Sequence, residues 1–70
     1  MKYLIVIEKT NTGYSAYAPD IEGCVSTGVT LDEVKQNMQE AIEFHFEGLQ
    51  KEGYQIPVPT SSTTYLEVAA

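Results

Sequence analysis

The chain has 70 residues, of which ten are acidic, four are lysines and none is arginine, so its net charge at pH 7 is −6. A chain this short forms at most one domain and buries only about 60% of the surface that the unfolded chain exposes, so residues 1–70 are expected to form a single domain. The acidity disfavours direct binding to the phosphates of nucleic acids and predicts that any charged partner is basic.

Cysteine and histidine content limits the covalent and metal chemistry that the chain can support. A single cysteine cannot form an internal disulfide, and with one histidine it falls short of a four-ligand zinc set. We therefore expect neither a metal ion nor a cofactor. No apolar run approaches the ~7–15 residues of a signal-peptide core or the ~20 residues of a membrane span. A cytoplasmic protein without a membrane segment is expected.

Three strands are predicted in the first half of the chain. Residues 2–9, KYLIVIEK, are β-branched and aromatic, and both faces are apolar, which predicts a central strand buried on both sides. TNTG at 10–13 is typical of a turn, and residues 14–18 alternate as the second arm of a hairpin. Pro19 ends that arm, because proline has no N–H for the ladder. Residues 24–29, CVSTGV, predict a third strand.

The polar residues between the second and third strands resemble a reactive or metal-binding site, but a turn explains them. Asp20, directly after Pro19, is interpreted as an Asx-turn residue that bonds its own backbone, and Gly23 as a position that needs an unusual backbone conformation. A metal site of Asp20, Glu22 and Glu8 is the alternative. The turn is favoured, because it accounts for Asp20 more simply.

A long helix follows with clear signals at both ends. Thr30 and Glu33 form a capping box, which predicts the helix start, and Gly53 is expected just after its last residue, near Glu52. Apolar residues recur within an arc of roughly 100°, as in a core-facing stripe. The stripe consists of Leu31, Val34, Met38, Ala41, Ile42, His45 and Leu49.

The last part of the chain predicts a connector and a fourth strand. Residues 54–62 contain two prolines and read as extended, whereas residues 63–68, TTYLEV, have the composition of a strand. A strand, helix, strand crossover joins parallel strands. We therefore expect an α+β fold with the order β-β-β-α-β. Its four-stranded mixed sheet has the order 3-2-1-4, and the one helix covers one face.

The uncovered face of this sheet is predicted to be a binding surface. It would display some of four tyrosines, an apolar surface that monomers rarely leave open, so a homodimer, a higher oligomer or a complex with another protein is expected. These tyrosines are Tyr3, Tyr14, Tyr17 and Tyr65.

Phe44 is predicted to be a second contact. It lies away from the apolar stripe of the helix, so it is not expected to pack in the core of the domain. Aromatic residues concentrate at interface hot spots. The neighbouring Glu40, Glu43 and Glu47 would complement a basic partner. Cys24 and His45 invite a cysteine-hydrolase interpretation, but His45 lies on the apolar stripe without an obvious orienting residue. A protein that is not an enzyme is expected.

The pattern from Tyr14 to Glu33 resembles that of the HicB-like antitoxin domain. It reads Y-x-A-x-x-P-D-x-x-G-C-x-x-x-G-x-T-x-x-E, and P-x-P-x-S follows at Pro57, Pro59 and Ser61. The resemblance extends over essentially all 70 residues. Glu22 departs from it, since the family often has a proline there.

The resemblance implies a partial ribonuclease H-like fold and the role of antitoxin in a type II toxin–antitoxin system. Family members neutralise a HicA-like toxin, a small basic ribonuclease that cleaves mRNA, by direct protein binding. Longer members carry a C-terminal DNA-binding segment; this chain stops at Ala70, so a short stand-alone form is expected. The alternative is a homo-oligomeric domain with a structural or regulatory role and no toxin partner.

Overall fold

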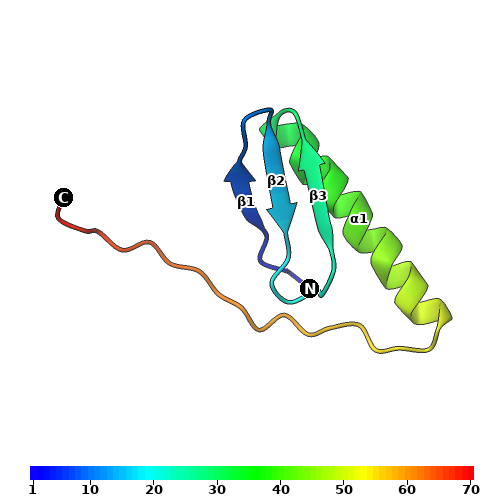
Figure 1. Cartoon of the computed structure of the whole chain (residues 1–70). Helices are drawn as coiled ribbons and strands as arrows, with labels where there is room; N and C mark the ends of the chain where they lie inside the picture. The colour runs from blue at the N-terminus through cyan, green and yellow to red at the C-terminus, as the bar shows by residue number, and fades with distance from the viewer.

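The structure is a computed structural model that describes residues 1–70, and it places three strands before one helix. The elements are β1 (Val6–Lys9), β2 (Tyr14–Tyr17), β3 (Val25–Gly28) and α1 (Leu31–Lys51). The strands form one antiparallel sheet in the order β1-β2-β3, and α1 lies across one face of it (Figure 1). The predicted α+β class and the arrangement of the first three strands are confirmed.

Strand register decides which side chains face the helix. Ala16 in β2 pairs with Ile7 in β1, and both pack in or against the core under α1. Val6 and Tyr17 form the preceding pair and point to the opposite face, because side chains alternate along a strand. Tyr17 also pairs with Val25 in β3. The uncovered face therefore carries an apolar row across all three strands.

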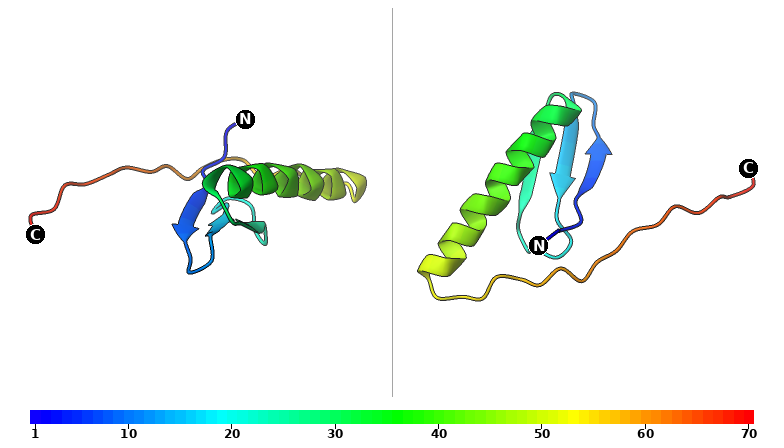
Figure 2. Two further views of the ribbon diagram at one scale, coloured as in Figure 1. Left: turned by 90° about the horizontal axis from the view of Figure 1, so that it is seen from above. Right: turned by 180° about the vertical axis from the view of Figure 1, so that it is seen from behind.

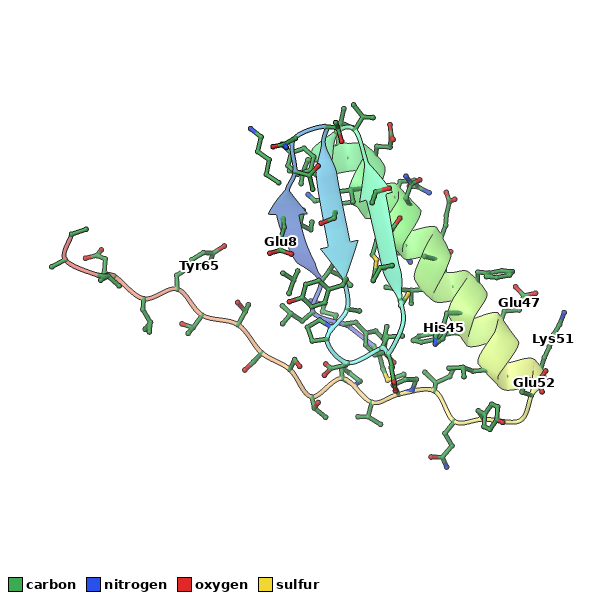
Figure 3. The ribbon with its side chains drawn as sticks, viewed as in Figure 1. Glu8, His45, Glu47, Lys51, Glu52 and Tyr65 are labelled. Carbon is green, nitrogen blue, oxygen red and sulfur yellow. The ribbon has the colours of Figure 1, made fainter.

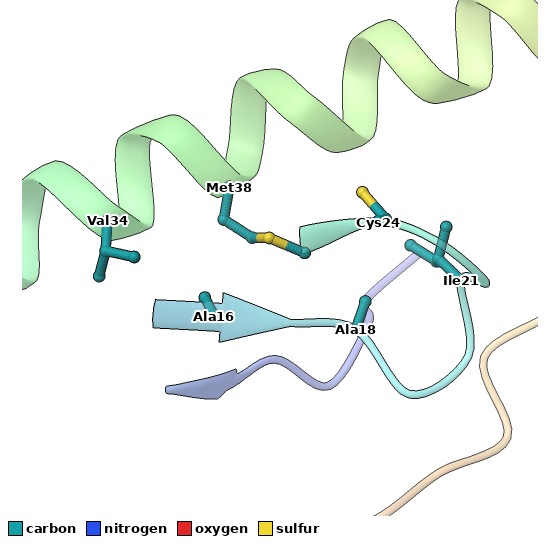
Figure 4. Packing of buried hydrophobic residues seen from close by; sticks show 6 residues of the cluster. All are labelled: Ala16, Ala18, Ile21, Cys24, Val34 and Met38. Carbon is teal, nitrogen blue, oxygen red and sulfur yellow. The ribbon is translucent and has the colours of Figure 1, made fainter. Parts of the chain in front are cut away.

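The core is small and lies between α1 and the helix-facing side of β2 and β3. Val34 and Met38 project from the helix toward Ala16 and Ala18, whose short side chains let α1 approach the sheet closely (Figure 4). Only six of 70 residues are buried: Ala16, Ala18, Ile21, Cys24, Val34 and Met38. Partly buried residues surround them: Tyr3, Ile5, Ile7, Tyr14, Ala41, Ile42 and Phe46.

Both ends of α1 are capped by local hydrogen bonds. Thr30 Oγ1 accepts a hydrogen bond of 3.1 Å from the backbone N–H of Glu33. The Glu33 carboxylate in turn accepts one of 3.2 Å from the backbone N–H of Val29. At the other end Gly53 has φ of 76°, and the Tyr54 N–H donates to the carbonyl of Leu49 at 2.9 Å. This Schellman arrangement satisfies carbonyls that the last turn would leave unpaired.

The predicted fourth strand is wrong. Residues 63–68 belong to no strand; from the end of α1 the chain runs extended below the sheet and then away past β1 (Figures 1 and 2). The sheet is therefore purely antiparallel rather than mixed, and β1 is an edge strand rather than a central one. The route of the chain gives the physical reason. The carboxylate of Asp20 accepts hydrogen bonds from the backbone N–H groups of Thr60 and Ser61, and beyond Ser61 the chain leads away from its own sheet (Figure 1).

Candidate functional site

The length of α1 creates a groove beside the sheet. With 21 residues at 1.5 Å each, the helix is about 30 Å long, whereas a four-residue strand such as β3 spans only about 13 Å. The last turns of α1 therefore extend beyond the sheet (Figure 1). Between them and the beginning of β3 lies a groove of about 610 Å³.

Apolar groups dominate the groove. Its most exposed large hydrophobic residues are Phe44, Val25 and Tyr54, with 79%, 68% and 66% of their surfaces accessible. None of the three is buried by the chain's own fold, so the groove offers apolar surface to another molecule. We call it the β3–α1 groove and define it by Cys24, Val25, Phe44, His45, Gly48 and Tyr54.

An acidic flank borders this groove on α1. It consists of Glu40, Glu43 and Glu47, all exposed. The side-chain amide of Gln36 donates to Glu40 at 2.7 Å, and that of Gln39 donates to Glu43 at 2.9 Å. Figure 3 shows Glu47 projecting from the side of α1 opposite His45, which points toward the sheet. Despite its length, α1 is not apolar enough to cross a membrane.

The structure brings only some of the predicted contact residues together. Phe44 and Glu47 both line the groove, and the rest of the acidic flank lies beside them. Tyr17 is 41% exposed and lies on the uncovered sheet face. Tyr65 is 97% exposed, on the extended C-terminal segment far from the groove (Figure 3).

Tyr3 has a structural contact that the sequence did not indicate. Its ring meets that of Phe46 edge to face, with centroids 5.4 Å apart, and its hydroxyl donates to the carbonyl of Pro57. Tyr3 therefore joins the N-terminus to α1 and to the connector on the helix side of the sheet. It does not contribute to the uncovered face.

Cys24 and His45 line the same groove, but the electrostatics of Cys24 do not suit a nucleophile. Burial raises the pKa of the Cys24 thiol, whereas a reactive cysteine needs a lowered pKa to be present as thiolate. No three histidine, cysteine or carboxylate side chains gather in a way that could hold a metal ion.

Asp20 fastens the connector to the rest of the fold. Its Oδ2 accepts bonds from the backbone N–H groups of Thr60 and Ser61 at 3.0 and 2.9 Å. Its Oδ1 accepts bonds from the hydroxyls of the same two residues at 3.0 and 2.7 Å. The predicted Asx turn is therefore wrong in its partner, because the carboxylate accepts hydrogen bonds from residues 40 and 41 positions away. Within the same turn, Gly23 has φ of 75°, a conformation that side-chain-bearing residues rarely adopt.

These bonds make the attachment of the connector dependent on pH. Hydrogen bonds from the Ser61 backbone and hydroxyl, and then from Thr60, lower the pKa of Asp20 from 3.8 to about 2. A lowered folded-state pKa stabilises the attached form above the ordinary pKa and loses that effect as the pH falls through the lower value. We expect the connector to remain attached above about pH 4 and to be released as the pH approaches 2. The amide chemical shifts of Thr60 and Ser61 measure this release.

Asp20→Asn should release the same segment at neutral pH, because the neutral amide attracts the four donors less strongly. The matched control is Glu22→Gln, in the same turn and exposed, which should leave both amide signals unchanged. Identical Thr60 and Ser61 signals in the Asp20→Asn variant and the unaltered chain would contradict this role.

Sequence reasoning missed Val25 and Tyr54 as groove residues and Phe46 as a core contact. The first two become neighbours of Phe44 only because α1 overhangs the sheet, which no local pattern encodes. A signal did exist for the bond between Asp20 and Ser61. Both residues belong to the P-D and P-x-P-x-S parts of the pattern noted above, and the structure shows that these two parts bind each other.

Known proteins have sequences similar to that of this chain. Residues 3–69 match the family model described as "HicB_like antitoxin of bacterial toxin-antitoxin system". An uncharacterised 14.9 kDa protein from the rep-hol intergenic region of Haemophilus phage HP1 is 42% identical over 66 residues, covering 94% of this chain and 50% of the relative. A UPF0150 protein of Synechocystis is 41% identical over 56 residues, covering 79% and 71%. The chain thus spans half the length of the phage relative.

Solved structures agree with the sequence match. A chain of the "HicA3 and HicB3 toxin-antitoxin complex" superposes with a TM-score of 0.74 at 40% identity, covering 86% of this chain and 70% of that one. The structure of the antitoxin HicB3 superposes with a TM-score of 0.73 at 40% identity, covering 86% and 44%. From the family match, the identities and the shared fold, this chain belongs to the family of HicB-like antitoxins of bacterial toxin–antitoxin systems.

Proposed function

We propose that this chain is the antitoxin of a HicA/HicB-like pair and that it neutralises a basic, mRNA-cleaving toxin by binding it directly. The observation that carries the proposal is the 40% identity and TM-score of 0.74 to a chain of a toxin–antitoxin complex. In this role the chain acts by covering a surface of the toxin and performs no chemistry of its own.

The β3–α1 groove is the proposed contact surface for the toxin. Phe44 stands at its edge with most of its ring exposed, and a buried aromatic anchor surrounded by polar groups is the usual arrangement of an interface hot spot. Val25 and Tyr54 line the groove together with Phe44. A side chain of the partner can enter the groove and contact all three residues. Association would bury these three residues together.

Charge supports a basic partner. The chain has a net charge of −6, and the acidic flank stands beside Phe44 on the same helix. Opposite charge raises the rate of association and suppresses wrong partners. A toxin that binds RNA must carry a positive surface, so the acidic flank would compete with RNA for that surface.

Co-expression with the adjacent reading frame tests this function. If the proposal holds, that frame encodes a short Lys/Arg-rich protein whose expression alone stops growth and degrades mRNA. Co-expression with this chain should restore growth, and a tag on either protein should recover both. Restored growth together with a recovered complex supports direct neutralisation.

The opposite outcomes favour the homo-oligomeric alternative. If the neighbouring product is not toxic, or if growth stays arrested while this chain is present and folded, the antitoxin proposal fails. Circular dichroism of the purified chain, which should show the helix, separates a failed function from a failed fold.

A further inference from the structure

We propose that residues 63–68 form a strand in an assembly of two copies, in which this segment of each chain pairs with the outer edge of β1 in the other. We call residues 62–70 the arm. The inference concerns the purified chain alone and is independent of any toxin.

The arm has the side chains of a strand but no partner within its own chain. Tyr65, Leu66 and Val68 are 97%, 82% and 81% exposed. The one hydrogen bond of an arm side chain, from the Thr64 hydroxyl to the carbonyl of Tyr65, lies within the arm, so no side chain of the arm is bonded to the rest of the fold. An extended segment with three large apolar side chains is typical of peptides that add as a strand to the exposed edge of a sheet.

Two contacts direct the arm away from its own sheet. The Tyr3 hydroxyl holds Pro57, and Asp20 holds Thr60 and Ser61 through four hydrogen bonds. Beyond Ser61 the chain continues past β1 into open space, as all three views show (Figures 1 and 2). The radius of gyration is 14.0 Å, against about 11 Å for a compact domain of this length. The fold thus presents the arm outward on a fixed base.

The outer edge of β1 is the better of the two sheet edges for receiving it. β3 forms the other edge, but α1 lies along it, and the side-chain amide of Asn37 donates to the carbonyl of Thr27 at 2.9 Å. β1 has no neighbour beyond it, and α1 does not reach it. Its backbone groups are therefore free to pair with a strand from outside.

A second copy of the chain suits this edge better than an unrelated protein. Each chain carries both an arm and a free β1 edge, so a two-fold arrangement forms the same contact twice and closes the assembly. The two segments carry side chains of opposite charge. Lys2 precedes β1 and Lys9 is its last residue, whereas the arm carries Glu67. Pairing would also extend the apolar row of Val6 and Tyr17 on the uncovered sheet face.

Proline variants of the full chain test the pairing. Adjacent N–H groups in a strand point to opposite sides, so the N–H of either Tyr65 or Leu66 points to the partner strand. Proline has no N–H, so at least one of the variants Tyr65→Pro and Leu66→Pro must remove a hydrogen bond between the strands. In an unpaired arm neither change removes a contact. The matched control is Ala70→Pro, outside residues 63–68. The unaltered chain and the control should show twice the mass of one chain by light scattering at micromolar concentration. At least one arm variant should raise the dissociation constant of the dimer about tenfold or more.

An isotope-mixing experiment identifies the chain that each arm contacts. In an equal mixture of labelled and unlabelled protein, isotope-filtered NMR should show contacts between the methyl groups of Leu66 or Val68 in one copy and β1 residues in the other. The proposal is overturned if the unaltered chain is a monomer or if these contacts occur only within one chain. It is also overturned if both arm variants dimerise as tightly as the control.

Discussion

Gly28→Ala should remove a large part of the stability of this protein. A Cβ atom at position 28 would lie 2.5 Å from the backbone nitrogen and 2.8 Å from the Cα of Val34, and 3.0 Å from the carbonyl carbon of Glu33. All three atoms belong to the backbone of the first turns of α1. A rotamer change therefore cannot relieve the contact, and β3 and α1 would have to separate.

The expected size of this effect follows from general magnitudes. Overpacking a core costs about 1–3 kcal/mol, and more when the backbone must move, whereas a domain of this length has about 4–10 kcal/mol in total. We expect a loss of about 3 kcal/mol. Since 1 kcal/mol shifts the Tm of a small domain by about 4–8 °C, the Tm should fall by at least about 12 °C. Thermal denaturation followed by circular dichroism at a fixed protein concentration measures the shift.

Gly48→Ala is the matched control for this prediction. A Cβ at position 48 meets no atom within 4 Å, and alanine is favoured over glycine inside a helix by about 1 kcal/mol. The same substitution should therefore raise the Tm at position 48 and lower it at position 28. Equal Tm values for Gly28→Ala and the unaltered chain would show that β3 and α1 do not pack as closely as described.

Phe44→Ala should weaken toxin binding with little effect on folding. A hot-spot aromatic residue contributes about 2 kcal/mol or more, which corresponds to about a 30-fold rise in Kd. Phe44 is 79% exposed, so its truncation removes little from the core, and alanine is the better helix former. The Kd should therefore rise while the Tm is maintained. Calorimetric titration with a catalytically inactive toxin measures the first quantity.

Val29→Ala controls for the general loss of exposed apolar surface. Val29 is 67% exposed and precedes the N-cap of α1, at the opposite end of the helix from the groove. Its truncation should leave the Kd unchanged. If both variants bind as the unaltered chain does, the toxin contacts another surface.

Local signals in the sequence were sufficient for α1 and the hairpin. The capping box of Thr30 and Glu33 and the glycine at position 53 predicted the ends of the helix, because caps are decided by a few neighbouring residues. The turn at 10–13 likewise predicted the pairing of β1 with β2. Such interactions lie within a few residues of one another, so the sequence alone encodes them.

Long-range contacts could not be predicted in the same way. The composition of residues 63–68 suits a strand, but the hydrogen bonds from Thr60 and Ser61 to Asp20 lead the following residues away from the free edge of β1 in their own chain. The partner of Asp20 was missed for a related reason, since Thr60 and Ser61 come near it only after the connector has passed beneath the sheet. The groove depends on the overhang of α1, which follows from the relative lengths of the helix and β3.

Titration of the purified chain with the purified, catalytically inactive protein from the adjacent reading frame tests the proposed function most directly. The proposal predicts saturable binding at micromolar concentrations or below, weakened by added salt because of the acidic flank and weakened by Phe44→Ala but not by Val29→Ala. The absence of saturable binding between two folded proteins at micromolar concentrations would contradict it.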